Sequence, residues 1–182
     1  AFAADVSTFA ELKAALADTA TTTITLTADI ATPEKLLINR PLTIIGGGKT
    51  VSFAPNPVGW NGNYVFHVYG TSDVTISDIK LTSGDAGLLV NNSNVTLTGA
   101  VDVSGNEFGG SESSNGSVLT VSGATITNST ESYRFPTAWE DGTTGATIVG
   151  FSATSNTTVV PTQVQYYLQT SSLTTVTTAA YL

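Results

Sequence analysis

One short pattern returns along much of this chain: an apolar residue, a threonine and a second apolar residue. A period of about 21 residues separates its copies once two loop-like segments, 55–62 and 106–116, are set aside. A strand-like triplet that returns at such a period is typical of stacked repeats, in which each repeat packs on its neighbours. The threonines of the six copies are Thr25, Thr43, Thr75, Thr96, Thr125 and Thr147.

Two further apolar motifs accompany the triplet, one before it and one after it. Three short strands per repeat, joined by Gly, Asn, Asp and Ser, predict a parallel β-helix. Alternation along each strand then places the flanking apolar residues inward and the central threonine outward. An antiparallel sandwich is the alternative, but it does not require one triplet to return at one period. The preceding motif stands at 36–38, 66–68, 88–90 and 119–121, and the following motif at 51–53, 79–81 and 101–103.

Two of the repeats resemble rungs of the pectate-lyase-like right-handed β-helix superfamily. They are RPLTIIGGGKT at 40–50 and SDVTISDIKLT at 72–82, and the resemblance covers roughly residues 5–150. It implies an all-β, right-handed parallel β-helix, or β-solenoid, of about six to seven rungs. It implies the fold alone, because lyases, hydrolases, adhesins and phage tail proteins share these motifs.

The first element is predicted to be a helix. Thr8 and Glu11 have the capping-box spacing, and Phe9, Leu12 and Leu16 form an apolar stripe that ends near Asp18. We expect this helix to cover the N-terminal mouth of the solenoid. The chain is then a single domain over 1–182, with a capping helix in 5–18, rungs in 22–150 and C-terminal strands in 151–182. Those last strands either cap this chain or pair with a neighbouring subunit.

The composition excludes several classes of function. Lys and Arg total 6 against 14 Asp and Glu, a net charge of −8, so no basic patch for nucleic acid is expected. The absence of Cys excludes disulfides, zinc–cysteine sites and thiol catalysis. No apolar run approaches the ~20 residues of a transmembrane helix. The small residues around Phe2 resemble a signal-peptide cleavage site, which predicts a secreted or cell-surface protein; an arbitrary chain boundary is the alternative.

The outward residues of the first strand in each rung are expected to form the column Leu37, His67, Leu89 and Thr120. Catalytic relatives carry their substrate cleft on this strip, where glycoside hydrolysis needs two carboxylates. The column offers none, so no catalytic residue, cofactor or metal is predicted. His67 is expected to be a half-exposed packing residue. Asp73, Asp78 and Asp85 are better explained as turn residues than as calcium ligands, and Lys80 with Asp102 as an exposed cross-strand ion pair.

Aromatic residues on the two insertions suggest a binding surface. Trp60, Tyr64 and Phe108 could flank a shallow groove that stacks a sugar ring, beside the column of Leu37 and its neighbours. The alternative is that these aromatics only anchor the loops to the solenoid. The outward threonine ladder resembles the arrays of ice-binding solenoids, although Thr is also simply a favoured residue on exposed strands.

These observations predict an exported, non-enzymatic surface protein. It would be either a self-assembling extracellular subunit, of a filament or surface-layer type, or an adhesive module. Its partners would be its own copies, or a cell-surface or glycan ligand. A carbohydrate-binding or polysaccharide-active protein is the alternative, but about 30 Å of stacked rungs is short for a cleft that grips several sugars.

Overall fold

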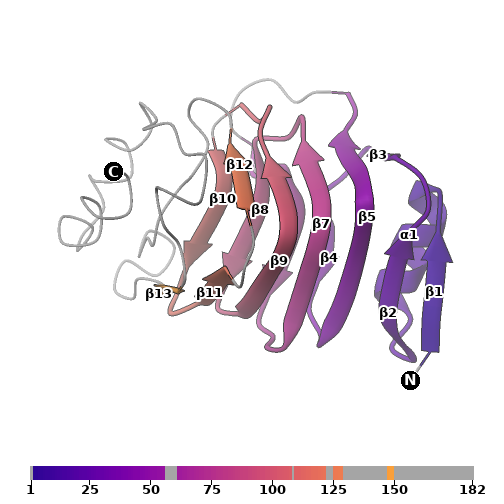
Figure 1. The fold of residues 1–182 in the computed structure, drawn as a ribbon, viewed down its shortest axis with the longest axis horizontal. Coiled ribbons are helices and arrows are strands. Elements are labelled where there is room, and N and C mark those ends of the chain that lie inside the picture. Colours follow the sequence, from indigo (N-terminus) through magenta and orange to yellow (C-terminus); the bar gives the residue numbers. More distant parts are fainter. Residues whose placement is uncertain (1, 56–60, 108, 122–124, 129–146, 150–182) are drawn as a thin grey trace.

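The chain winds into a parallel β-solenoid of about five turns (Figure 1). The computed structural model describes residues 2–55, 61–107, 109–121, 125–128 and 147–149. The fold class is confirmed, with a lower turn count than predicted. The described elements are β1 (Phe2–Val6), α1 (Phe9–Ala17), β2 (Thr21–Leu26), β3 (Ile30–Thr32), β4 (Leu36–Ile38), β5 (Leu42–Phe53), β6 (Tyr64–Tyr69), β7 (Val74–Thr82), β8 (Ala86–Asn91), β9 (Asn94–Val103), β10 (Gly109–Ser114), β11 (Val118–Val121), β12 (Thr125–Asn128) and β13 (Thr147–Val149).

The strands form two sheets that enclose one core. Sheet B contains β4, β6, β8 and β10 in that order, and sheet A contains the remaining strands. Sheet A turns a corner within its long strands. The first half of β5 pairs with β2 and its second half with β3, the first half of β9 pairs with β11 and its second half with β12, and β7 pairs with β5 and β9 through both halves. Each full turn therefore presents three faces, as the three motifs per repeat predicted.

The corner within sheet A depends on residues that tolerate a left-handed backbone. Asp78 has φ 48° and Gly99 has φ 69°. A Cβ atom at Gly99 would collide with the Asp78 carboxylate, which accepts a hydrogen bond from the amide of Ala100 at 2.9 Å. Glycine is required at this position both by its dihedral angle and by the space that the aspartate fills.

The interior is a stack of aliphatic side chains. The central inward positions of sheet A carry Ile24, Ile44, Ile76, Leu97 and Val121, all buried and in register from strand to strand. Full burial of such a side chain stabilises the fold by about 1.5–3 kcal/mol. The inward orientation of the apolar residues in each triplet is thereby confirmed.

Buried polar side chains form hydrogen bonds between adjacent turns of the solenoid at its corners. Ser93 donates from Oγ to the carbonyl of Asn91 at 2.8 Å, and its amide donates to Oγ of Ser117 at 3.0 Å. At another corner the Asn106 amide donates to the carbonyls of Leu81 and Val103, and its oxygen accepts from the amide of Gly84. These contacts satisfy backbone groups that the strand ladders leave unpaired.

The N-terminal cap forms as predicted. Thr8 is the N-cap of α1 and accepts a hydrogen bond from the amide of Glu11 at 3.2 Å. The Glu11 carboxylate accepts from the amide and hydroxyl of Ser7, and these bonds lower the pKa of Glu11. Leu12 and Leu16 are buried against the solenoid. Strand β1, which precedes the helix and pairs in parallel with β2, was not predicted.

The threonine ladder exists, but the prediction misplaced half of its members. Thr43, Thr75 and Thr96 pair in register, as expected. Thr25 instead lies opposite Ile45, Thr125 lies opposite Ala100 on the third face, and Thr147 lies opposite Val118. The ladder of the structure is therefore Thr23, Thr43, Thr75, Thr96 and Thr120.

For Thr125, the cause lies in residues 106–116, which the sequence predicted to be a loop. Residues Gly109–Ser114 form β10, which pairs with β8 over its whole length. Because this strand was counted as loop, the motif at 119–121 was placed on the first face, whereas β11 lies on the second. The predicted C-terminal strands in 151–182 lie outside the described residues.

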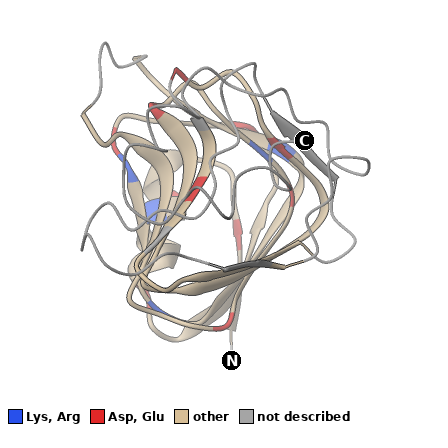
Figure 2. Cartoon of the chain, turned by 90° about the vertical axis from the view of Figure 1, so that its left-hand side faces the viewer, with Lys and Arg blue, Asp and Glu red and all other residues tan. Residues whose placement is uncertain are grey.

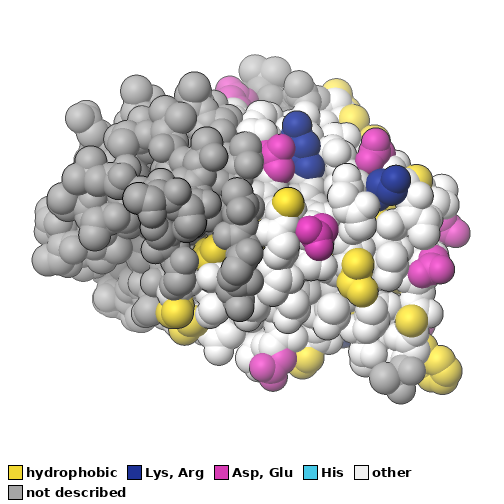
Figure 3. Space-filling model, in the orientation of Figure 1, with side chains coloured by type: hydrophobic (Ala, Val, Ile, Leu, Met, Phe, Trp, Pro, Cys, Tyr) yellow, Lys and Arg dark blue, Asp and Glu magenta, His cyan; other side chains and the backbone are white. Residues whose placement is uncertain are grey.

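The surface carries few charges, and Figures 2 and 3 show them scattered rather than gathered in one patch. The described residues form two ion pairs, Lys13 with Glu34 at 2.9 Å and Lys80 with Asp102 at 3.8 Å. The second is the pair predicted from the sequence. Within the described part of the chain, no helix is long and apolar enough to cross a membrane.

Candidate functional site

The outer face of sheet B carries a row of side chains that run across all four strands. Leu37 on β4, His67 on β6, Leu89 on β8 and Glu112 on β10 lie opposite one another in register. Three of these were predicted. The fourth position was predicted to be Thr120, which instead belongs to the threonine ladder on sheet A. The outer row therefore ends in a carboxylate, contrary to the prediction of a column without one.

Tyr64 joins this outer row because side-chain alternation breaks at the start of β6. Val65 and Phe66 both belong to the interior cluster, whereas Tyr64 packs with Ala86 and Leu89. The Tyr64 hydroxyl crosses β8 and donates to Oε2 of Glu112 at 2.9 Å. Glu112 is fully buried and Tyr64 is 4% exposed. This end of the face is closed, and its carboxylate is held by a charge-assisted hydrogen bond.

His67 lies between two tyrosine rings. Its ring centroid is 5.9 Å from that of Tyr64 and 5.7 Å from that of Tyr69, the latter in an edge-on arrangement. Burial, together with the nearby charge of Lys35, lowers the pKa of His67 to about 4. His67 is therefore neutral at pH 7 and presents an aromatic, uncharged surface.

The other end of the face is open. Leu37 is 47% exposed and Tyr69 is 50% exposed, and both flank the half-buried His67. Lys35, two residues before Leu37, is also exposed and adds a cation at the edge. The face is thus divided into a closed half over β8 and β10 and an open half over β4 and β6, which we call the open half-face: Lys35, Leu37, His67 and Tyr69.

The described residues of this row do not include the pair of carboxylates that glycoside hydrolysis uses. In the row of described residues Glu112 is the one carboxylate, whereas glycoside hydrolysis uses two. Glu112 and His67 are two strands apart, about 10 Å, which is too far for direct proton transfer between them. The described residues hold no group of three or more Asp, Glu or His side chains that could bind a metal. The open half-face itself is apolar and aromatic, with one cation, Lys35, at its edge.

Comparison with known families agrees with this geometry. Residues 3–157 match the model of the family described as "Putative pectate lyase-like adhesive domain". The chain belongs to this family. No curated protein and no solved structure matches the chain.

In this member of the adhesive family, the aspartates considered as calcium ligands lie at corners of the solenoid: Asp73 just before β7, Asp78 at the corner within β7, and Asp85 just before β8. Asp73 and Asp78 have left-handed backbones, with φ of 59° and 48°. Asp85 is fully buried, and its Oδ2 atom accepts hydrogen bonds from the amides of Asn61 and Asn63 at 2.7 and 3.0 Å. Asp85 thereby fixes residues 61–63, which lead directly into β6.

The structure brings together four of the six predicted surface residues, namely Tyr64, Leu37, His67 and Leu89. Trp60 and Phe108 lie outside the described residues. Sequence reasoning missed Tyr69 and Lys35, although each is two residues from a predicted outward residue and alternation could have found them. It also missed Glu112, because a Gly- and Ser-rich stretch gave no strand signal.

Proposed function

We propose that this chain is a non-enzymatic adhesive module that binds its partner through the open half-face of sheet B. One observation carries the proposal: an apolar and partly aromatic surface, with the cation Lys35 at its edge, is left exposed on the same sheet whose Glu112 carboxylate is buried. The description of the family as an adhesive domain supports it. The single buried carboxylate of the row supports the absence of catalysis.

A glycan is the partner that this surface suits best. Tyr69 and the ring of His67 present aromatic area, and Leu37 extends it along the neighbouring strand. Amphipathic rings combine an apolar face with a polar tip, as do sugars, and lose little conformational entropy on binding. Lys35 and the Tyr69 hydroxyl offer hydrogen-bond donors at the edge. Such shallow sites bind weakly, so we expect adhesion to depend on many copies.

The test is binding to immobilised glycans and host-matrix polymers by the wild type and by Leu37→Ser with Tyr69→Ala. The double variant should lose at least about tenfold in affinity, as expected when central aromatic contacts are removed. The matched control is Ile45→Ser, because Ile45 is an exposed apolar residue of sheet A, at 38%. Release of sugar products by the wild type, or equal binding by the double variant, would exclude the proposal.

We further propose that the module acts outside the cell, where an adhesive surface meets its partners, and that its copies associate. Association would occur when an extended C-terminal strand pairs with a free sheet edge of the next copy, as strand addition does elsewhere. Fractionation of the producing cells tests the location. Light scattering over a range of concentrations tests association, and a strictly monomeric protein at high concentration would exclude it.

A further inference from the structure

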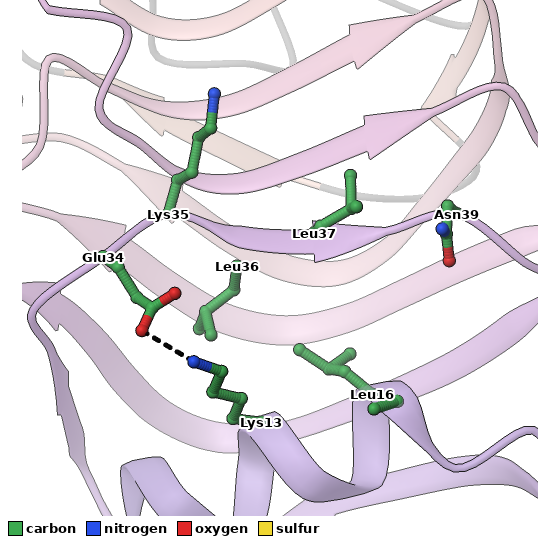
Figure 4. Close-up of a pocket in the computed structure, with 8 residues that line it drawn as sticks. Lys13, Leu16, Glu34, Lys35, Leu36, Leu37 and Asn39 are labelled. Carbon is green, nitrogen blue, oxygen red and sulfur yellow. Dashed lines mark hydrogen bonds and ion pairs between the residues drawn. The ribbon is translucent and has the colours of Figure 1, made fainter.

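The recess between α1 and β4 in Figure 4 shares Lys35 and Leu37 with the open half-face, so it belongs to the surface already described. A separate hollow of about 380 Å³ lies at the corner where the strands of sheet B lead into those of sheet A, and we call it the corner trough. The residues that line it carry no charge, and they include Gly70, Thr71, Ser72, Asn92, Asn94 and Gly116.

Glycines keep the corner trough open. Gly70 and Gly116 both have left-handed backbones, with φ of 63° and 70°. A Cβ atom at Gly70 would meet no described atom within 4 Å. Asn92 also has a left-handed backbone, with φ of 48°, and its side chain is exposed. Among the described residues, the trough is therefore a hollow of the outer surface.

Three complete N-glycosylation sequons, of the form Asn-x-Ser or Asn-x-Thr, fall within the described residues, and one of them opens into the corner trough. They begin at Asn91, Asn94 and Asn115. The sequon at Asn128 extends beyond the described residues, and the one at Asn156 lies outside them.

Two of these sequons are held within the fold. Asn91 is 2% exposed, and its Oδ1 atom accepts a hydrogen bond at 2.6 Å from the Nδ2 atom of Asn115. The hydroxyls that complete both sequons are buried as well, because Ser93 donates to the carbonyl of Asn91 and Ser117 donates to the carbonyl of Val90. An enzyme reaches either sequon only after this corner opens locally.

The third sequon is accessible. Asn94 is exposed and lines the corner trough. Thr96 lies on the same outward face of β9, because Val95 between them is buried. Among the described residues, neither the Asn94 amide nor the Thr96 hydroxyl has a hydrogen-bond partner. The amide and the hydroxyl that define a sequon are thus presented together on the surface.

We propose that Asn94 is an N-glycosylation acceptor, and that the folded protein accepts sugar there and not at Asn91 or Asn115. The donor is a sugar activated as its diphosphate ester. The Nδ2 atom of Asn94 loses one proton and forms a bond to the anomeric carbon, while the bond from that carbon to the diphosphate oxygen breaks and the diphosphate leaves with the electron pair. The uncharged lining of the trough suits a neutral first sugar.

The proposal rests on the proposed location outside the cell, since glycosylation of this type marks exported proteins. It does not rest on the partner that the open half-face binds. Fractionation of the producing cells reports on the location, and glycan-array binding by Asn94→Gln reports on the open half-face. Failure of Asn94 as an acceptor is therefore distinguishable from failure of either part of the proposed function.

The first test uses a soluble N-glycosyltransferase with a nucleotide-activated hexose, and locates the sugar by peptide mapping with mass spectrometry. In the folded protein, Asn94 should be modified at least about tenfold faster than Asn91 or Asn115, because the latter two require local opening. A synthetic peptide of residues 88–120, which cannot bury any of the three, should lose this preference. Thr96→Val removes the sequon hydroxyl and should abolish modification at Asn94. Thr75→Val changes the neighbouring threonine of the same ladder and should not.

The second test is the mass of the protein isolated from its producing cells. The peptide that contains Asn94 should carry sugar, and Asn94→Gln should lose it. The proposal is overturned if Asn94 carries no sugar in this material, if the folded protein is modified at Asn91 or Asn115 as fast as at Asn94, or if Thr96→Val is modified as fast as the wild type.

Discussion

Arg40 locks the N-terminal cap onto the solenoid. Its guanidinium donates to the carbonyls of Leu16 at 3.1 Å and Ala15 at 2.9 Å, both in the last turn of α1, and to the carbonyl of Thr21 at the start of β2. The last carbonyls of a helix have no partner within the helix, and a cation there is favoured by the helix dipole. We predict that Arg40→Met releases the cap.

The expected cost follows from these contacts. A hydrogen bond to a charged group contributes about 1.5–3 kcal/mol, but Arg40 is half-buried, so water can reach part of the freed carbonyls. Three such bonds that act together should then contribute about 2–4 kcal/mol. That is a large share of the 5–15 kcal/mol that stabilises an ordinary domain. Urea unfolding followed by circular dichroism measures the loss, and amide exchange in α1 shows whether the helix opens first.

Two further variants make this test specific. Arg40→Lys keeps the charge but not the planar guanidinium group that makes three hydrogen bonds, so it should lower the free energy of unfolding by an intermediate amount. Lys80→Met removes a cation whose ion pair is exposed and 3.8 Å long, and it should cost under about 1 kcal/mol. The reasoning is refuted if Arg40→Met costs no more than Lys80→Met, or if amide exchange in α1 is unchanged.

Three other changes have expected outcomes. Ser111 and Ser113 are fully buried at inward positions, and the structure gives their hydroxyls no hydrogen-bond partner, so Ser111→Val and Ser113→Val should each raise the unfolding free energy by about 1 kcal/mol in urea titrations. Asn106→Ala should lower it by about 3 kcal/mol, since two carbonyls and one amide at a buried corner lose their partner. The pKa of His67 is about 4 when folded and 6.5 when unfolded, so the unfolded chain binds more protons between these values. Stability should therefore fall as pH drops from about 6.5 to 4, and His67→Phe should flatten that part of the profile measured by urea midpoints; an unchanged profile would contradict the lowered pKa.

The fold could be predicted because the sequence shows both the two-residue alternation of a strand and the repeat of about 21 residues of a stacked solenoid. The triplets at Leu42, Val74 and Val95 each bury two apolar residues and turn a half-buried threonine outward, and this alternation needs no tertiary information. The capping box at Thr8 is equally local. For such features the sequence pattern and the packing agree.

The features that sequence reasoning missed depend on partners distant in the chain. β10 has no apolar or β-branched residue and forms because the edge of β8 offers it a ladder to pair with. Arg40 contacts a helix that ends 23 residues earlier. Glu112 meets Tyr64 across 48 residues. Each of these contacts can be predicted only when it is known which strands lie on which turn and face of the solenoid. Because β10 was counted as loop, β11 and β12 were each assigned to a face one third of a turn away.

Once β10 is counted as a strand, Glu112 takes the place in the outer row of sheet B that Thr120 was predicted to hold. The sequence predicted no catalysis because this row was expected to carry no charged residue. Glu112 lies in the row, so that reason no longer holds. The Glu112 carboxylate is buried, and its hydrogen bond holds Tyr64 over Leu89. Tyr64 in turn contacts the ring of His67, which contacts Tyr69. The buried carboxylate thus belongs to a chain of contacts that ends at the exposed aromatic surface. If that surface binds the partner as proposed, these contacts order it in advance and lower the entropy lost on binding.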